Sequence, residues 1–291
     1  MSLNSDEQGY LDLLKKILDV GSSRDDRTGT GTISLFGPQL SFDLRNSVIP
    51  VLTTKKIAIR IIIEELLWFI KGSTDGKELE DKKVFIWKAN GTREYLDKIG
   101  LHDRNENDLG PIYGFQWRHA GADYTNCNAD YSGKGIDQLA EVIDKIKNKP
   151  YDRRMLVVSW NVKDIPIMAL PPCHCLFQFY VADGYLSCKL YQRSADMGLG
   201  VPFNITSYSL LVHMIAHVCK LKPREFIHSF GDVHIYNNHV EQLKEQINRK
   251  PYSFPKIKFA REVESIDDFK TDDFIIEGYN AHPRIIMELS A

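Results

Sequence analysis

Residues 172–194 read PCHCLFQFYVADGYLSCKLYQRS and contain two apolar-rich runs separated by a turn dipeptide. The runs 176–181 and 186–191 have the length of strands, and Asp183-Gly184 between them is a strong signal for a tight hairpin turn. In an antiparallel hairpin, the residues before the first strand and after the second lie at the same end of the sheet. The pattern therefore predicts that Cys173 and Arg193 are neighbours.

A thiol beside a guanidinium has a chemistry of its own. The positive charge favours the thiolate, which is the nucleophilic form of cysteine. The alternative is a buried structural thiol, which is the commoner role of a single cysteine. We do not predict a zinc site, because Cys173-His174-Cys175 are adjacent and the usual spacing C-x-x-C is absent. The hairpin alone thus indicates a reactive cysteine and an anionic substrate.

Outside this segment, helical and strand patterns follow each other irregularly. Apolar residues at helical spacing predict helices near 10–18, 57–69, 136–147, 205–219 and 236–246. Strands are predicted near 155–160 and 226–229, and a second hairpin is predicted from 33–35 and 40–44. Residues 72–135 are rich in Gly, Asn and Asp and are predicted to be mainly loops. Because no βαβ rhythm is visible, we expect an α+β fold, while the length of 291 residues fits either two domains or one large mixed domain.

The composition excludes several classes of protein. The chain has 37 Lys+Arg against 39 Asp+Glu, a formal net charge of −2, which argues against a dedicated nucleic-acid or anionic-membrane binder. No run approaches the roughly 18 apolar residues needed to span a bilayer. The N-terminus lacks the basic and apolar parts of a secretory signal, and five cysteines fit free thiols better than disulfides. We therefore expect a cytoplasmic protein, with the nucleus as the alternative location.

The positions of the arginines narrow the class of substrate that we expect. Arg27 stands in the glycine-rich segment RTGTGT (27–32), Arg153 and Arg154 precede a predicted strand, and Arg193-Ser194 follow one. Each alone is most often a surface residue, but forked guanidinium donors with a hydroxyl suit phosphate oxygens. The Gly-Thr segment lacks the Gly-Lys-Ser/Thr of a triphosphate-binding loop. A monophosphate is therefore the favoured ligand.

Taken together, the motifs of this chain closely resemble those of the thymidylate synthase family, in order and along nearly the whole chain. The matching segments are RTGTGT (27–32), ELLWF (65–69), LGPIYGFQWR (109–118), Arg153-Arg154, PCH (172–174), YQRSAD (191–196), GVPFN (200–204), GDVHIY (231–236) and EGY (277–279). The resemblance implies a methyltransferase of dTMP biosynthesis that converts dUMP to dTMP. It implies 5,10-methylenetetrahydrofolate as one-carbon and hydride donor, dihydrofolate as product, and neither a metal nor a nicotinamide cofactor. The length of the chain leads us to expect the monofunctional form.

The resemblance also implies catalytic roles. Cys173 would add to carbon 6 of the uracil ring, so that carbon 5 can attack the folate methylene. Asn204 would hold the uracil edge, although an Asn that caps a helix starting near residue 205 is an alternative. Glu65, acting through water, and Tyr113 would serve near carbon 5. Glu65 interrupts an apolar helix, where an unpartnered buried carboxylate is costly, whereas Glu64 could simply be exposed. Arg193 and Asp196 complete the implied catalytic set.

Binding residues are implied in the same way. The phosphate of dUMP would meet Arg27, Arg193 and Ser194, with Arg153 and Arg154 supplied by a second subunit. The remaining implied dUMP contacts are Cys173, His174, Asp196, Asn204, His234 and Tyr236, with His174 shaping the site rather than acting as a base. The implied folate contacts are Trp87, Asp196, Leu199, Gly200, Phe203, Lys55 and Ser290. The resemblance also implies a single mixed-sheet domain over residues 1–291 and a homodimer that is packed through its sheets.

Two other functions remain open from the sequence. A deoxypyrimidine-monophosphate hydroxymethylase of the same superfamily would quench the methylene intermediate with water. Asn204 argues against its dCMP version, because relatives that use dCMP have Asp at this position. A non-catalytic nucleotide- or RNA-binding relative is the second alternative. It is disfavoured because the residues implied in catalysis are present. Neither a membrane nor a nucleic-acid partner is required by the main interpretation.

Overall fold

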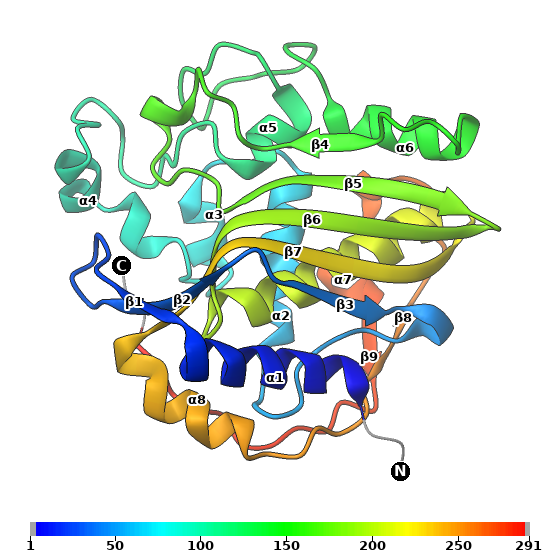
Figure 1. Cartoon of the computed structure of the whole chain (residues 1–291). Coiled ribbons are helices and arrows are strands. Elements are labelled where there is room, and N and C mark those ends of the chain that lie inside the picture. Colours follow the sequence, from blue (N-terminus) through cyan, green and yellow to red (C-terminus); the bar gives the residue numbers. More distant parts are fainter. Residues whose placement is uncertain (1–3, 289–291) are drawn as a thin grey trace.

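A mixed β-sheet runs through the centre of the computed structural model, which describes residues 4–288 (Figure 1). Within these residues the sheet has seven strands, in the order β1-β2-β7-β6-β5-β4, and β3 also pairs with β7. The strands are β1 Ser22–Arg24, β2 Thr32–Phe36, β3 Gln39–Asp43, β4 Leu156–Val158, β5 His174–Ala182, β6 Tyr185–Asp196 and β7 Lys222–Tyr236. A separate small sheet pairs β8 Lys256–Phe259 with β9 Phe274–Glu277. The predicted α+β class with a mixed sheet is confirmed.

Helices surround this sheet and cover one of its faces. They are α1 Ser5–Val20, α2 Ile59–Ile70, α3 Gly76–Asp81, α4 Arg93–Lys98, α5 Tyr113–His119, α6 Gln138–Asn148, α7 Gly200–Val218 and α8 Val240–Ile247. Helix α7 packs on β6 and β7, and α2 packs on α7, so these two helices lie behind the sheet in Figure 1. Most of α7 is buried, as its largely apolar sequence requires. Among the described residues, no helix is long and apolar enough to cross a membrane.

The hairpin predicted from residues 176–181 and 186–191 is present. β5 and β6 pair antiparallel, with Phe177 opposite Leu190 and Ala182 opposite Tyr185. Asp183 and Gly184 both have positive φ, 52° and 77°, the backbone that a two-residue hairpin turn needs. A register shift between His174 and Leu176 marks an irregularity where the strand meets the site.

The second predicted hairpin is wrong. β2 and β3 both pair antiparallel with the long strand β7, β2 with 232–236 and β3 with 225–229. They therefore run in the same direction along one partner and do not fold back on each other. Gly37, with φ of 84°, provides the kink between them, and its N–H donates to the carbonyl of Gly231. Local alternation could not reveal this arrangement, because the shared partner lies almost 200 residues further along the chain.

Two other local predictions need correction. β6 and β7 are parallel and are joined through α7, so one βαβ crossover exists where none was expected. Region 72–135 is mainly loop, as predicted, with the short helices α3, α4 and α5 in it. Helix α7 begins at Gly200, so Asn204 lies inside the helix and is not its N-cap. Instead, the Asp196 carboxylate accepts hydrogen bonds from the N–H groups of Leu199 and Gly200, which satisfies the free donors of the first turn.

Candidate active site

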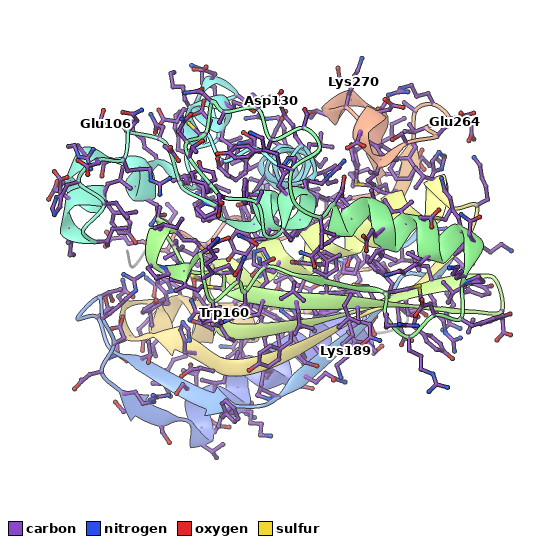
Figure 2. All side chains as sticks on the ribbon, turned by 90° about the horizontal axis from the view of Figure 1, so that it is seen from above. Glu106, Asp130, Trp160, Lys189, Glu264 and Lys270 are labelled. Atoms are coloured by element: carbon purple, nitrogen blue, oxygen red, sulfur yellow. The ribbon has the colours of Figure 1, made fainter. Side chains whose placement is uncertain are left out.

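Cys173 and Arg193 are neighbours, as the hairpin predicted. The N–H of Arg193 donates to the carbonyl of Cys173 at 2.8 Å, and Arg193 Nη2 lies 3.9 Å from Cys173 Sγ. The guanidinium is fixed from behind, because Nε donates to the carbonyl of Pro172 at 2.8 Å and Nη2 to that of Pro171 at 3.0 Å. It also faces the ring of Trp160, 5.1 Å from the ring centroid. Figure 2 labels Trp160 beside the sheet.

The electrostatics of the thiol differ in part from the expectation. Burial raises the pKa of Cys173 above its ordinary value, whereas the charges of Arg193 and Arg27 act to lower it. The guanidinium thus favours the thiolate as predicted, but loss of solvation is the larger effect. In this conformation Cys173 is a thiol at neutral pH, and the positive charges of Arg193 and Arg27 favour its deprotonation.

An aromatic group packs beside the nucleophile. The backbone N–H of Cys173 donates to the hydroxyl of Tyr113 at 2.7 Å. The rings of Tyr113 and His174 stack with centroids 3.9 Å apart, and His174 Nδ1 shares a 2.7 Å hydrogen bond with the Tyr208 hydroxyl. Burial lowers the pKa of His174 to about 3, so the imidazole is neutral. This geometry fits a residue that shapes the site.

Glu65 reaches the same aromatic group from α2. Trp87 Nε1 donates to Glu65 Oε1 at 2.7 Å, and the ring of Trp87 lies edge-on to Tyr113 at 5.9 Å. Burial raises the pKa of Glu65 to about 7, against the lowering effect of the Trp87 hydrogen bond. A carboxyl that titrates near neutrality can both accept and donate a proton, which is the property that acid–base catalysis needs.

Glu64 is not the exposed residue that we expected. Its side chain is 8% exposed and forms an ion pair with Lys82 at 2.8 Å. Thr271 Oγ1 also donates to Glu64 Oε1 at 2.7 Å. The helix therefore turns both glutamates inward, and Glu64 ties α2 to the segment before β9, which the apolar pattern of α2 could not show.

Asn204 belongs to a chain of side-chain hydrogen bonds. His228 Nε2 and Gln192 Oε1 are 2.8 Å apart, and Gln192 Nε2 donates to Asn204 Oδ1 at 3.1 Å. Burial holds the pKa of His228 well below its ordinary value, so this imidazole is neutral and donates to Gln192. The orientation of the Asn204 amide is thus fixed, with its Nδ2 left as the free donor.

The predicted phosphate and sugar residues gather at one end of the sheet. Ser194 pairs with Asp232 across β6 and β7, and Asp196 with His234, while β2 places Thr32 opposite Tyr236. His234 Nδ1 lies 3.0 Å from an oxygen of Asp232. The loop that carries Arg27 leads directly into β2, and its Asp26 carboxylate accepts from the N–H groups of Thr28 and Gly31, which fixes the loop.

Most of the predicted folate residues that the structure describes lie around the start of α7, whereas Trp87 lies against α2 and Tyr113. Asp196 accepts from three backbone N–H groups there, those of Gly198, Leu199 and Gly200. Phe203 is half-buried against the main core, and Trp87 is buried. Lys55 is also buried, its Nζ donates to the carbonyl of Gly198, and burial lowers its pKa to about 8. Ser290 lies outside the described residues.

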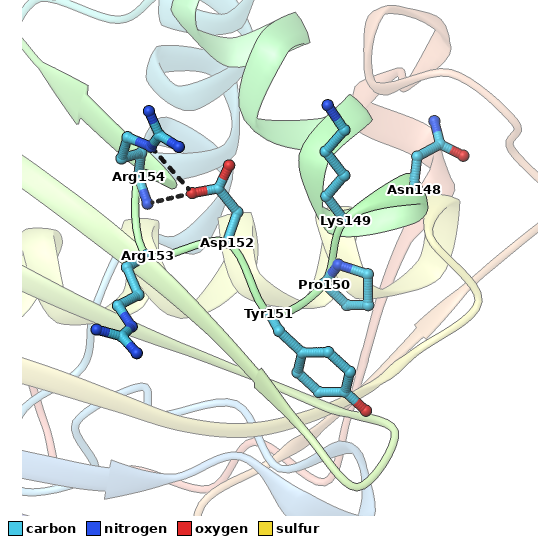
Figure 3. Close-up of a pocket in the computed structure, with 7 residues that line it drawn as sticks. All are labelled: Asn148, Lys149, Pro150, Tyr151, Asp152, Arg153 and Arg154. Carbon is cyan, nitrogen blue, oxygen red and sulfur yellow. Dashed lines mark hydrogen bonds and ion pairs between the residues drawn. The ribbon is translucent and has the colours of Figure 1, made fainter.

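Arg153 and Arg154 are far from this site within the chain. Figure 3 shows them in a hollow that is lined by residues 148–154, where the N–H of Arg154 donates to Asp152 at 2.8 Å. β4 and β5 pair Leu156 with Gln178, so residue 154 lies beside residue 180. That position is roughly 20 Å along β5 from Cys173. The structure therefore does not bring this pair to the Cys173 of the same chain.

The sequence of the chain matches those of known proteins. A family model described as thymidylate synthase matches residues 8–291. The chain belongs to the thymidylate synthase family. The thymidylate synthase of Homo sapiens is 59% identical over 284 residues, which cover 98% of this chain and 90% of that protein. That of Saccharomyces cerevisiae is 58% identical over 297 residues, covering 99% and 98%. The bifunctional dihydrofolate reductase-thymidylate synthase 2 of Arabidopsis thaliana is 56% identical over 98% of this chain and 50% of its own length.

Several residues of the candidate site in this member of the thymidylate synthase family are not among those predicted from the sequence. Gln192 lies inside the motif segment 191–196, and Tyr208 lies one helical turn after Asn204. The sequence near a predicted site residue could therefore have indicated both. Trp160 and His228 had none, because only the sheet brings them to Arg193 and Gln192. Within residues 4–288, no group of three or more His, Cys, Asp and Glu side chains is placed to hold a metal ion.

Proposed function

We propose that this chain converts dUMP to dTMP by reductive methylation, with Cys173 as the nucleophile that adds to carbon 6 of the uracil. The observation that carries this proposal is the position of Cys173 Sγ, 3.9 Å from the Arg193 guanidinium and beside Tyr113. The activity is that of its family, thymidylate synthase, a methyltransferase of dTMP biosynthesis. The hydroxymethylase and non-catalytic alternatives are not favoured.

The thiol must lose its proton when it attacks. Arg193 stabilises the resulting thiolate, and Arg27 adds to the positive potential at the sulfur. Addition of sulfur to carbon 6 places negative charge on the ring, spread toward the oxygen at carbon 4. Asn204 Nδ2, left free by the Gln192 hydrogen bond to Oδ1, is the donor that would receive this oxygen.

Removal of the proton from carbon 5 needs a base that is ionised at neutral pH. Glu65, with its pKa raised to about 7, meets that requirement, whereas His174, with its pKa lowered to about 3, is too weak a base to take this proton. Tyr113 lies between Glu65 and Cys173 and can relay a proton through its hydroxyl or through water. Glu65 and Tyr113 define the acid–base side of the proposed site.

The proposed co-substrate is 5,10-methylenetetrahydrofolate, which supplies one carbon and a hydride. Trp87, Phe203, Leu199 and Gly200 would receive its aromatic rings, and Asp196 its pterin nitrogen atoms. The fit is supported by the clustering of Asp196, Leu199 and Gly200 at the first turn of α7. Lys55 contributes indirectly in this arrangement, because its ammonium holds the carbonyl of Gly198.

We further propose that two copies of this single domain, residues 1–291, form a homodimer through the open face of the sheet. Large apolar side chains stand exposed on that face, among them Val158 and Tyr180, which is 63% exposed. Lys189, labelled in Figure 2, lies on the neighbouring strand β6, opposite Gln178 of β5. A second copy would cover this apolar surface and could bring its own Arg153 and Arg154 to the phosphate site, which they cannot reach in their own chain. The cytoplasm or nucleus remains the proposed location.

A spectrophotometric assay for dihydrofolate tests the main proposal. With methylenetetrahydrofolate present, dUMP should produce dihydrofolate and dTMP, whereas dCMP should not. Cys173→Ala should lose turnover by on the order of 10⁴-fold or more while it still binds dUMP. Cys127→Ala, which removes a half-buried thiol in the 72–135 region, is the control and should keep full activity. Hydroxymethylated nucleotide with no dihydrofolate would contradict the proposal.

A further inference from the structure

His239 is a buried histidine that the proposed reaction does not use. It follows β7 in the short turn Asn237–His239, and its side chain is fully buried. The ring lies between the turn 196–200, which leads into α7, and the C-terminal segment 285–288. Its edge faces the ring of Tyr236, with the centroids 5.7 Å apart.

The hydrogen bond on one side of the ring fixes its tautomer. His239 Nε2 lies 2.6 Å from the carbonyl oxygen of Glu288. A carbonyl can only accept, so Nε2 must carry a proton in this contact. Nδ1 is therefore the atom whose protonation can vary. It lies 3.9 Å from Asp196 Oδ1 and has no hydrogen-bond partner among the described residues.

Gly198 makes room for this arrangement. A Cβ atom added at Gly198 would lie 2.6 Å from His239 Nδ1 and 3.2 Å from both Asp196 Oδ1 and Met287 Sδ. Three separate parts of the chain thus meet at one point: the turn before α7, the turn after β7 and the C-terminal segment. A side chain at residue 198 would push them apart.

We propose that His239 is a positioning residue that fastens the C-terminal segment 285–288 to the Asp196 turn, and that it does so best as an imidazolium. With Nε2–H bound to Glu288, an unprotonated Nδ1 would point its lone pair at the Asp196 carboxylate. A second proton replaces that repulsion by a charge-assisted attraction. Docking of the segment and proton uptake by His239 are therefore linked.

The charged and titratable groups around His239 set the sign of this linkage. Asp196 faces Nδ1, Lys55 lies behind Gly198, and Tyr10 and Tyr236 border the turn. Burial acts to lower the pKa of His239, but Asp196 and the Glu288 carbonyl outweigh it and the pKa is raised. The fastened state is therefore complete at acidic pH and is lost as pH rises through this raised pKa.

Limited trypsin digestion of the full chain tests the inference. Arg284 is exposed and is followed by buried Ile285, so release of the segment should expose the bond after Arg284. The cleavage rate, measured by intact mass and normalised to a short peptide substrate, should rise with pH in the native protein. His239→Leu should be cleaved about 10- to 100-fold faster at acidic pH, the range expected when a hydrogen bond to a charged group is lost.

Two variants and a control make the test decisive. His239→Gln retains a donor for Glu288 but brings no positive charge to Asp196 and cannot titrate. Its cleavage should therefore be independent of pH, at the faster rate that the native protein reaches at high pH. Gly198→Ala should speed cleavage by displacing the His239 ring. This variant tests the role of His239 if His239→Leu does not fold. His102→Gln, at a histidine whose side chain is 70% exposed, should behave as the native protein. Slow cleavage of both His239→Leu and Gly198→Ala, or the native pH dependence in His239→Gln, would overturn the proposal.

A kinetic readout extends the test to catalysis and rests on the proposed function. His239→Leu should raise the KM for methylenetetrahydrofolate several-fold and leave the KM for dUMP unchanged. His239→Gln, which restores only the hydrogen bond to Glu288, should reverse part of this increase. Absence of any dihydrofolate production by the native protein would count against the proposed function alone, since the cleavage assay does not depend on turnover.

Discussion

Trp87 Nε1 donates a 2.7 Å hydrogen bond to Glu65 Oε1. This contact is one of two opposing influences on the carboxyl group. Burial raises the pKa of Glu65, and the indole N–H, which binds the ionised form more strongly, lowers it, with a result of about 7. Burial and the Trp87 hydrogen bond together therefore give the Glu65 carboxyl a pKa near neutral pH, beside the aromatic residues that pack around Cys173.

Replacing this carboxyl should remove acid–base catalysis. Glu65→Gln keeps the shape and the Trp87 contact but cannot exchange a proton, so kcat should fall by about 10²- to 10⁴-fold. The inflection near pH 7 in the pH dependence of kcat/KM should also disappear. Glu94→Gln, at an exposed position in the first turn of α4, is the matched control. Retention of both the rate and the inflection in Glu65→Gln would rule out this role.

The same group makes stability depend on pH. Because the pKa of Glu65 is higher in the folded protein than its ordinary value of 4.5, the folded state binds this proton more tightly than the unfolded state. Its contribution to stability is complete below about pH 4.5 and is lost as pH rises through about 7. Chemical denaturation of native protein and Glu65→Gln across this window should show a flatter free energy of unfolding in the variant. An identical slope in both would contradict the raised pKa.

Trp87→Phe tests the hydrogen bond separately from burial. The variant keeps an aromatic ring against Tyr113 but loses the N–H that stabilises the carboxylate. The pKa of Glu65 should rise further, and the inflection in kcat/KM should move to higher pH. The comparison with Glu65→Gln is informative, because there the inflection vanishes and here it shifts. An inflection that stays in place would show that the hydrogen bond has no effect on the titration.

Asn204→Asp should change the choice of base. Gln192 donates to Oδ1 of Asn204, and the remaining Nδ2 is a donor that suits the carbonyl at carbon 4 of uracil. A carboxylate at this position only accepts, which suits the amino group of cytosine. Competition between dUMP and dCMP should therefore shift toward dCMP, by at least tenfold if one hydrogen bond to a charged group is exchanged. Unchanged discrimination would remove Asn204 from this role.

Mixing two inactive variants tests the composite site. A chain with Arg153→Ala and Arg154→Ala lacks the phosphate residues that it would give its neighbour, whereas Cys173→Ala lacks the nucleophile. In mixed dimers one site regains both parts, so activity should recover to about a quarter of the native value. Mixing Cys173→Ala with Glu65→Gln, both from the same side of the site, provides a comparison that separates exchange of subunits from complementation. No recovery after verified exchange would argue that the two arginines do not cross the interface.

Sequence alone determined those features that depend on neighbours along the chain. The hairpin of β5 and β6 follows from two strand-length runs around Asp183-Gly184, and it brought Cys173 to Arg193 without any other information. Helix α6 followed from its apolar face in the same way. The motif segments then identified the family, because many short matches in a fixed order are specific even where each is weak.

Tertiary structure decided what depends on partners far apart in the chain. Only the sheet shows that β2 and β3 share β7, that Glu64 finds Lys82 and Thr271, and that His239 meets Asp196 and Glu288. The balance that raises the pKa of Cys173 likewise depends on how deeply packing buries the thiol. Hydrophobic periodicity predicts which side of a helix or strand is buried. Desolvation and hydrogen bonding depend on the residues that pack against that side, and only the tertiary structure shows these.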